Sequence, residues 1–358
     1  METRKIQQVS NGTFTVSLPR EWATEQGLSA GDVVDLHAHL DGVLVIQTDD
    51  AEIDELRVSL SCDERPGRLR RVLEAAYATG AREIRLEGDG QLPSDHRTAI
   101  RSAVRAMAGV TIGAETDEHV LVQSVLDADA VSVRQSLRQL QFVALSRHRT
   151  ATSALCDPDQ SLDSVGGGTS AERCSAMIER YFVRSLTRLD EVDTLGESRL
   201  DLFRFYRTAR ELANVAAHAE QIANIAVEVD ADAFGREDPS DTTAAIEAAA
   251  ADAREAVEVA ADAVAGPSPG DLWSVFERRD AVRQSVDAIE RRLFETAGAD
   301  YRVAQAVAAI RQTADCAASI AEVGVRRAVR EGVRGDDPAA AIGPDGDTGS
   351  RVADGAEE

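Results

Sequence analysis

Histidine and cysteine side chains are the first candidates for catalytic or metal chemistry. Of the six histidines, His37 and His39 lie two residues apart, so they share one face of a strand and could hold a metal ion. As a surface pair in a β segment, they are expected to be solvated instead. His218 lies among alanines in a helical segment and is expected to be an interior or groove residue rather than a ligand.

The cysteines are scattered along the chain, at Cys62, Cys156, Cys174 and Cys316. They form no C-x-x-C pair and no histidine lies at zinc-ligand spacing, so we expect buried, reduced thiols of a cytosolic protein. The sequence also contains no nucleotide-binding loop, no G-x-S-x-G motif and no glycine-rich dinucleotide motif. Without a convergent catalytic set, we expect neither enzymatic activity nor a cofactor.

The charged residues are strongly biased toward acids. The chain has 358 residues and a formal net charge of −24, and Lys5 is its single lysine among 39 basic residues. This composition is typical of proteins from a cytosol that holds concentrated salt, where the Debye length falls to about 3 Å and surface charges repel one another little. The alternative is an ordinary acidic protein from a GC-rich genome. Either way, net charge is a weak guide to the partner.

Residues 1–50 have the pattern of a small β module. Alternating apolar and polar residues over 13–18 predict a strand, and a short helix is predicted over 20–26. Two further strands, 33–36 and 43–46, are expected, with a tight Asp-Gly turn before the second. Fifty residues are too few to bury a stable core alone, so this module must complete its core with something else.

Residues 53–126 predict the order β-α-β-α-β-β, a small α/β sandwich, with Ser94 as the N-cap of its second helix. Within it, the segment DERPGRLRRVLEAA (63–76) resembles the start of small-molecule-sensing ACT domains, although the order of strands departs from that family. Residues 332–358 are expected to be a disordered acidic tail. No signal peptide and no run of about 18 apolar residues is present, so we expect a cytoplasmic protein without membrane insertion.

From about residue 127 to 331 the pattern is helical. The expected helices are 127–153, 170–195, 198–230, 241–265, 271–297 and 299–331. An internal repeat with an offset of 98 residues matches Ala216, Ala219, Ile222 and Ala223 to Ala314, Ala317, Ile320 and Ala321. The shared A-x-x-A-x-x-I-A pattern puts small residues on one helix face, where two helices can approach closely. It predicts two copies of a three-helix unit, 127–230 and 241–331, joined lengthwise.

These repeated segments resemble the signature helices of PhoU-type phosphate-uptake regulators. In that family a Glu-x-x-x-Asp pair on each such helix can bind metal through its carboxylate oxygens. Asp315 retains the Asp position here, whereas Arg311 stands at the Glu position and Ala213 and Ala217 occupy both positions of the first repeat. Asp315 is therefore a weak metal candidate, and we expect Arg311 and Asp315 to form an ion pair within one helix.

The segment NGTFTVSLPREWATEQGLSAGDVVDLHAHLDGVLVI (11–46) resembles the AbrB-like (SpoVT-AbrB) swapped-hairpin module. The shared features are a strand leading into Leu-Pro-Arg, a short helix, Gly-Leu-x-x-Gly-Asp and a closing hairpin. In that family two chains interleave their hairpins, which implies a homodimer formed through residues 1–50. The family commonly binds DNA through basic residues, and the matching ones here are Arg4, Lys5 and Arg20.

The sequence thus predicts a multidomain, mainly α protein. An AbrB-like β module is followed by a small α/β connector and a PhoU-like double three-helix bundle, an arrangement that resembles phosphate-uptake regulators of halophilic archaea. Two functions stay open: a dimeric DNA-binding transcriptional regulator of phosphate uptake, or an adaptor that binds phosphate-transporter components or a signalling protein and uses its N-terminal module only to dimerise. Residues 1–50 carry three basic and eight acidic side chains, which argues against ordinary DNA affinity.

Overall fold

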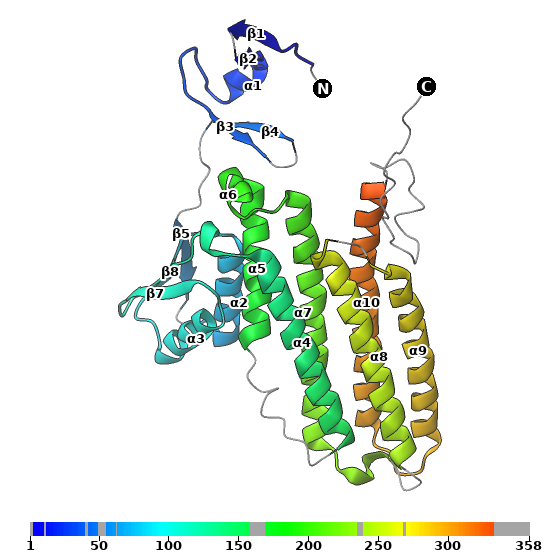
Figure 1. Ribbon diagram of the computed structural model, residues 1–358. Coiled ribbons are helices and arrows are strands. Elements are labelled where there is room, and N and C mark those ends of the chain that lie inside the picture. The colour runs from blue at the N-terminus through cyan, green and yellow to red at the C-terminus, as the bar shows by residue number, and fades with distance from the viewer. Residues whose placement is uncertain are drawn as a thin grey trace, which may run out of the picture.

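A computed structural model of the protein describes residues 3–10, 12–39, 42–48, 55–61, 63–157, 169–234, 239–267 and 270–332. Figure 1 shows a small β-rich part at the N-terminus, an α/β layer beside the bundle, and a bundle of long helices that run roughly parallel to one axis. This arrangement confirms the multidomain, mainly α fold class. Of the predicted tail, Gly332 is the last residue of the final helix and residues 333–358 lie outside the described part.

The N-terminal module, residues 3–48, holds two antiparallel strand pairs and one short helix. Its elements are β1 (Gln7–Ser10), β2 (Thr13–Thr15), α1 (Arg20–Glu25), β3 (Asp35–Ala38) and β4 (Leu44–Gln47). Strand β1 was not predicted. The signal for it was the Asn11-Gly12 dipeptide, a strong hairpin turn sequence, and Gly12 has a φ of 112°. Strand β3 starts at Asp35, two residues later than the predicted strand.

The connector, residues 55–126, is a two-layer α/β sandwich with the predicted order of elements. It consists of β5 (Glu55–Leu60), α2 (Pro66–Ala78), β6 (Glu83–Gly88), α3 (Ser94–Arg105), β7 (Val110–Glu115) and β8 (His119–Ser124). The strands lie in the order β5-β6-β8-β7, with β5 parallel to β6 and the other pairs antiparallel. Buried residues such as Leu73 and Ile84 form a core of their own. Pro93, not Ser94, occupies the N-cap position of α3.

The bundle consists of six long helices and one short one among the described residues. They are α4 (Val133–Cys156), α5 (Thr169–Thr187), α6 (Leu189–Thr194), α7 (Arg199–Glu228), α8 (Pro239–Ala265), α9 (Leu272–Glu295) and α10 (Tyr301–Gly332). The first helix starts six residues later than predicted, because the Ser132 hydroxyl accepts a bond of 3.2 Å from the Gln135 amide and caps the helix there. The segment 170–195 is interrupted at Arg188 and becomes two helices, α5 and α6.

The two three-helix units lie side by side along their length (Figure 1). Helix α7 packs against α10, and α4 packs against α8. The eight residues of the A-x-x-A-x-x-I-A repeat are buried, which confirms that its small-residue face is an interior one. The packed interior consists of two core clusters that follow one another along the axis of the bundle, and neither belongs to one repeat alone. One cluster contains Leu137, Phe205 and Ile320, and the second contains Ile222 and Ile310. Each cluster draws on both units, so the two units share their interior.

The connector is fixed to the bundle by arginines of α5. The Arg180 guanidinium donates to the carbonyl oxygens of Tyr77 at 2.6 Å and Ala81 at 2.8 Å, and Arg184 donates to the Gly80 carbonyl at 3.0 Å. These carbonyls lie at and just beyond the C-terminus of α2, where backbone acceptors lack partners within the helix and a cation is favourable. Gly80 has a φ of 89°, and a Cβ at this position would collide with Arg184. None of the helices within the described ranges is long and apolar enough to cross a membrane.

Candidate nucleic-acid interface

The N-terminal module exposes the side chains that should form its core. Phe14 is 68% exposed and Val33 is 86% exposed, and the other large apolar side chains on its surface are Ile6, Val9, Val16, Leu36, Val43 and Leu44. Among the described residues of the module, only His39 is buried. Contiguous exposed apolar residues of this kind mark an interaction surface. A single chain therefore leaves this module without a hydrophobic core, and a second chain can supply it.

The strand register places two of the three predicted DNA-binding residues at one end of the first hairpin. Gln7 pairs with Thr15, so Arg4 and Lys5, just before β1, lie at the same end of the hairpin as the residues that follow β2. Arg20 is the first residue of α1, five residues after Thr15. Arg4, Lys5 and Arg20 are all exposed. Exposed cations of this kind can bind phosphate oxygens or the base edges of DNA.

The histidine pair of this module departs from the expectation of a solvated surface pair. The rings of His37 and His39 stack with their centroids 6.3 Å apart, but His39 is buried. Its Nδ1 atom lies 3.5 Å from a carboxylate oxygen of Asp193 on α6. The β3–β4 hairpin segment therefore contacts the bundle through His39. The sequence pattern of the strand could not reveal that neighbour.

The predicted ion pair between Arg311 and Asp315 is wrong. Asp315 instead accepts from Arg283 of α9 at 2.7 Å, and Arg311 pairs with Asp287 at 2.6 Å and with Glu290 at 2.9 Å, both also on α9. These bonds fasten α10 to α9. Within the part of the chain that the structure describes, no group of three or more His, Cys, Asp or Glu residues is placed to hold a metal ion.

The bundle interior contains a small polar cluster at the contact between the repeats. His148 of α4 is fully buried, and its Nδ1 atom lies 3.4 Å from the Arg254 guanidinium of α8. His218 of α7 is partly buried and lies 3.5 Å from the Thr313 hydroxyl of α10, a position consistent with the predicted interior or groove residue. Burial lowers the pKa of both histidines, that of His148 to about 3. Both rings are therefore neutral at physiological pH.

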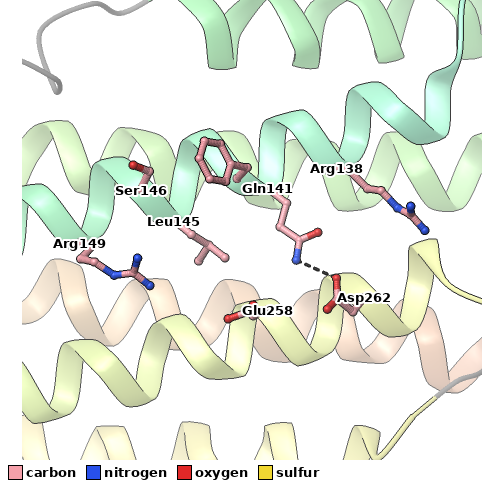
Figure 2. Close-up of a pocket in the computed structure, with 8 residues that line it drawn as sticks. Arg138, Gln141, Leu145, Ser146, Arg149, Glu258 and Asp262 are labelled. Carbon is pink, nitrogen blue, oxygen red and sulfur yellow. Dashed lines mark hydrogen bonds between the residues drawn. The ribbon is translucent and has the colours of Figure 1, made fainter.

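A groove of about 520 Å³ runs between α4 and α8 on the bundle surface. Figure 2 shows Arg138 and Arg149 toward its two ends, with Glu258 and Asp262 on the opposite helix. The Gln141 side chain crosses the groove and donates to Asp262 at 2.9 Å. The groove carries both signs of charge and no convergent set of reactive groups.

The three cysteines within the described ranges, Cys156, Cys174 and Cys316, are free thiols, and Cys62 lies outside those ranges. Burial raises the pKa of all three described thiols, that of Cys156 to about 12. They are therefore protonated and unreactive at neutral pH. Their chemistry adds nothing to the interface described above.

Residues 7–53 match the family described as antidote-toxin recognition MazE, bacterial antitoxin. The match spans the segment that resembles the AbrB-like module and supports that part of the expected assignment. It is compatible with a DNA-binding regulator and with a dimerisation module. No curated protein and no solved structure matches the chain. The resemblance of the helical bundle to PhoU has no support from these comparisons.

Proposed function

We propose that this protein is a homodimeric DNA-binding regulator of phosphate uptake. The observation that carries the proposal is the N-terminal module, which matches the family described as antidote-toxin recognition MazE, bacterial antitoxin, and leaves its apolar residues uncovered in one chain. Two modules complete each other's core and present two copies of Arg4, Lys5 and Arg20 to DNA. The bundle is the part that receives the signal.

Deletion of residues 1–50 is expected to convert the dimer into a monomer. The apolar side chains of the module are exposed in one chain, and burying them against a second copy is what drives association. Sedimentation or light scattering of the full and truncated chains measures the change as a halving of the mass. A truncated chain that stays dimeric would place the dimer interface elsewhere.

Replacing Arg4, Lys5 and Arg20 together with alanine is expected to abolish most DNA binding while the protein stays dimeric. A dimer loses six cations, and each phosphate contact accounts for about 0.9 in the slope of log affinity against log salt concentration. The slope should therefore fall by as much as about 5. The control replaces Arg138, Arg149 and Arg291, exposed arginines of the bundle, and matches the loss of charge. Equal DNA affinity in the two triple variants would exclude the proposed interface.

The phosphate part of the proposal rests on the resemblance of the two helical repeats to PhoU-type regulators. The buried repeat residues and the close contact of α7 with α10 support that resemblance. Chromatin occupancy of the tagged protein in its own host, under phosphate excess and phosphate starvation, tests it. Discrete sites whose occupancy changes with phosphate concentration support the phosphate-responsive regulator. Occupancy that is the same at both phosphate concentrations would contradict a response to phosphate.

An adaptor is the second candidate, and the charge of the N-terminal module favours it. Residues 1–50 hold eight acidic side chains against three basic ones, which weakens attraction to DNA. In this case the module only dimerises, and the groove between α4 and α8 contacts a phosphate-transporter component or a signalling protein. An adaptor shows no discrete DNA sites, and its capture of a transporter component depends on the bundle.

A further inference from the structure

A concavity of about 440 Å³ lies where the connector meets the bundle. It is formed by α3 and β7 of the connector and by α5 of the bundle, and we call it the connector pocket. Three arginines line it, Arg101, Arg105 and Arg173. Val104 and Met107, which are both buried, give it an apolar floor. Its volume lies in the usual range of small-ligand sites, roughly 300–1,000 Å³.

The charges of the connector pocket are all of one sign. Arg101 is neutralised by Glu115 of β7, with its Nη2 atom 2.7 Å from the carboxylate. The guanidinium groups of Arg105 and Arg173, by contrast, make no hydrogen bond or ion pair with any residue that the structure describes. No carboxylate lines the pocket. In a chain of net charge −24, two unpaired arginines facing one concavity leave a site that attracts an anion.

We propose that the connector pocket binds a small phosphorylated metabolite that also carries an apolar or planar part, of the class of a nucleoside monophosphate. The planar fork of a guanidinium matches two oxygens of a phosphate group, so Arg105 and Arg173 hold the phosphate between them. The floor formed by Val104 and Met107 takes the uncharged part of the ligand. This differs from the groove between α4 and α8, whose mixed charges select no anion.

The two walls of the connector pocket are held in place before any ligand arrives. Arg180 and Arg184 of α5 bind the carbonyl groups at the end of α2, and α2 packs against α3 in the connector. Arg173 lies on the same helix, α5, two turns before Arg180. The ligand therefore bridges two parts whose relative position is set, which lowers the entropic cost of binding. This proposal goes beyond the regulator function and holds whether or not the protein binds DNA.

Calorimetric titration of the full-length protein with AMP, inorganic phosphate and adenosine tests the proposal. AMP is expected to bind more tightly than phosphate, and adenosine should not bind measurably. Arg105→Gln and Arg173→Gln should each weaken AMP binding about tenfold or more, because each removes charge-assisted hydrogen bonds to the phosphate. Arg138→Gln, which removes an exposed arginine of the bundle groove, should leave the affinity unchanged.

Arg105 also lies in the last turn of α3, where its positive charge interacts favourably with the negative end of the helix dipole. Loss of Arg105 can therefore lower the stability of α3 as well as the affinity for AMP. Thermal unfolding of each variant without ligand separates the two effects, and Arg173→Gln tests the site from another helix. Failure of both AMP and phosphate to bind would overturn the site. Unchanged AMP affinity in Arg105→Gln and Arg173→Gln would overturn the location. Equal affinity for phosphate and AMP would overturn the apolar part of the ligand.

Discussion

Replacing Arg180 with methionine is expected to lower the free energy of unfolding by about 2–6 kcal/mol, because two buried backbone carbonyl groups lose their hydrogen-bond donor. The Arg180 side chain is buried, and its guanidinium carbon lies 4.7 Å from the centre of the Tyr77 ring. Burial lowers the Arg180 pKa to about 10, so the group stays charged at neutral pH. Methionine keeps the apolar stem but leaves the carbonyls of Tyr77 and Ala81 without their donor, at about 1–3 kcal/mol for each buried group.

Urea unfolding at pH 7, followed by circular dichroism, measures this loss. The matched control is Arg173→Met on the same helix, where the arginine is exposed and the change should fall within about 0.5 kcal/mol. Because Arg180 joins the connector to the bundle, the variant is also expected to unfold in two steps, with the connector melting first. A loss below about 1 kcal/mol would show that this junction contributes little to stability.

The stability of the protein should fall steeply with acid below pH 6.5, and His148 should account for a large part of that fall. Its folded pKa is about 3, because burial and the nearby Arg254 and His218 all disfavour the protonated ring. In the unfolded chain, where the histidine pKa is about 6.5, this ring binds a proton at a pH at which the folded protein leaves it neutral. The contribution of His148 is therefore constant above pH 6.5 and decreases by about 1.4 kcal/mol per pH unit between 6.5 and 3.

His148→Gln should remove this dependence, because glutamine does not titrate and its carbonyl can still accept from Arg254. Between pH 6.5 and 5, above the range where most carboxylates titrate, we expect the variant to lose about 2 kcal/mol less stability than the wild type. Parallel urea titrations at both pH values measure the difference. His119→Gln changes a histidine outside the bundle and is the control. Identical pH dependence in His148→Gln and wild type would show that the imidazole is protonated at little cost inside the fold.

Much of the fold follows from local sequence patterns. The order of the connector elements, the long helices and the small-residue face of the repeat were all predicted, because hydrophobic periodicity and turn residues act over a few residues of chain. The DNA-binding role of Arg4, Lys5 and Arg20 stays a prediction, which follows from the resemblance of residues 11–46 to the AbrB-like module. The hairpin register places Arg4 and Lys5 at the end of the first hairpin from which the chain continues towards α1 and Arg20.

The sequence did not predict the partners of charged side chains correctly. A spacing of four residues suggested that Arg311 and Asp315 bind each other, but both bind residues of α9 instead. Similarly, nothing in the α5 sequence distinguishes Arg180, which is buried against the connector, from Arg173, which is exposed. Periodicity states which face of a helix a residue occupies, but it does not state which element covers that face.

The sequence by itself determined most of the elements and their order, although it missed strand β1 and the break at Arg188, and it indicated that the N-terminal module is incomplete in one chain. Only the tertiary structure decided that the bundle shares two cores between its repeats, and that the connector docks on α5 and leaves Arg105 and Arg173 facing one pocket. The physical reason is one of range. Helix and strand formation depend on neighbours within a few residues, whereas burial and ion pairing depend on contacts between segments far apart in the chain.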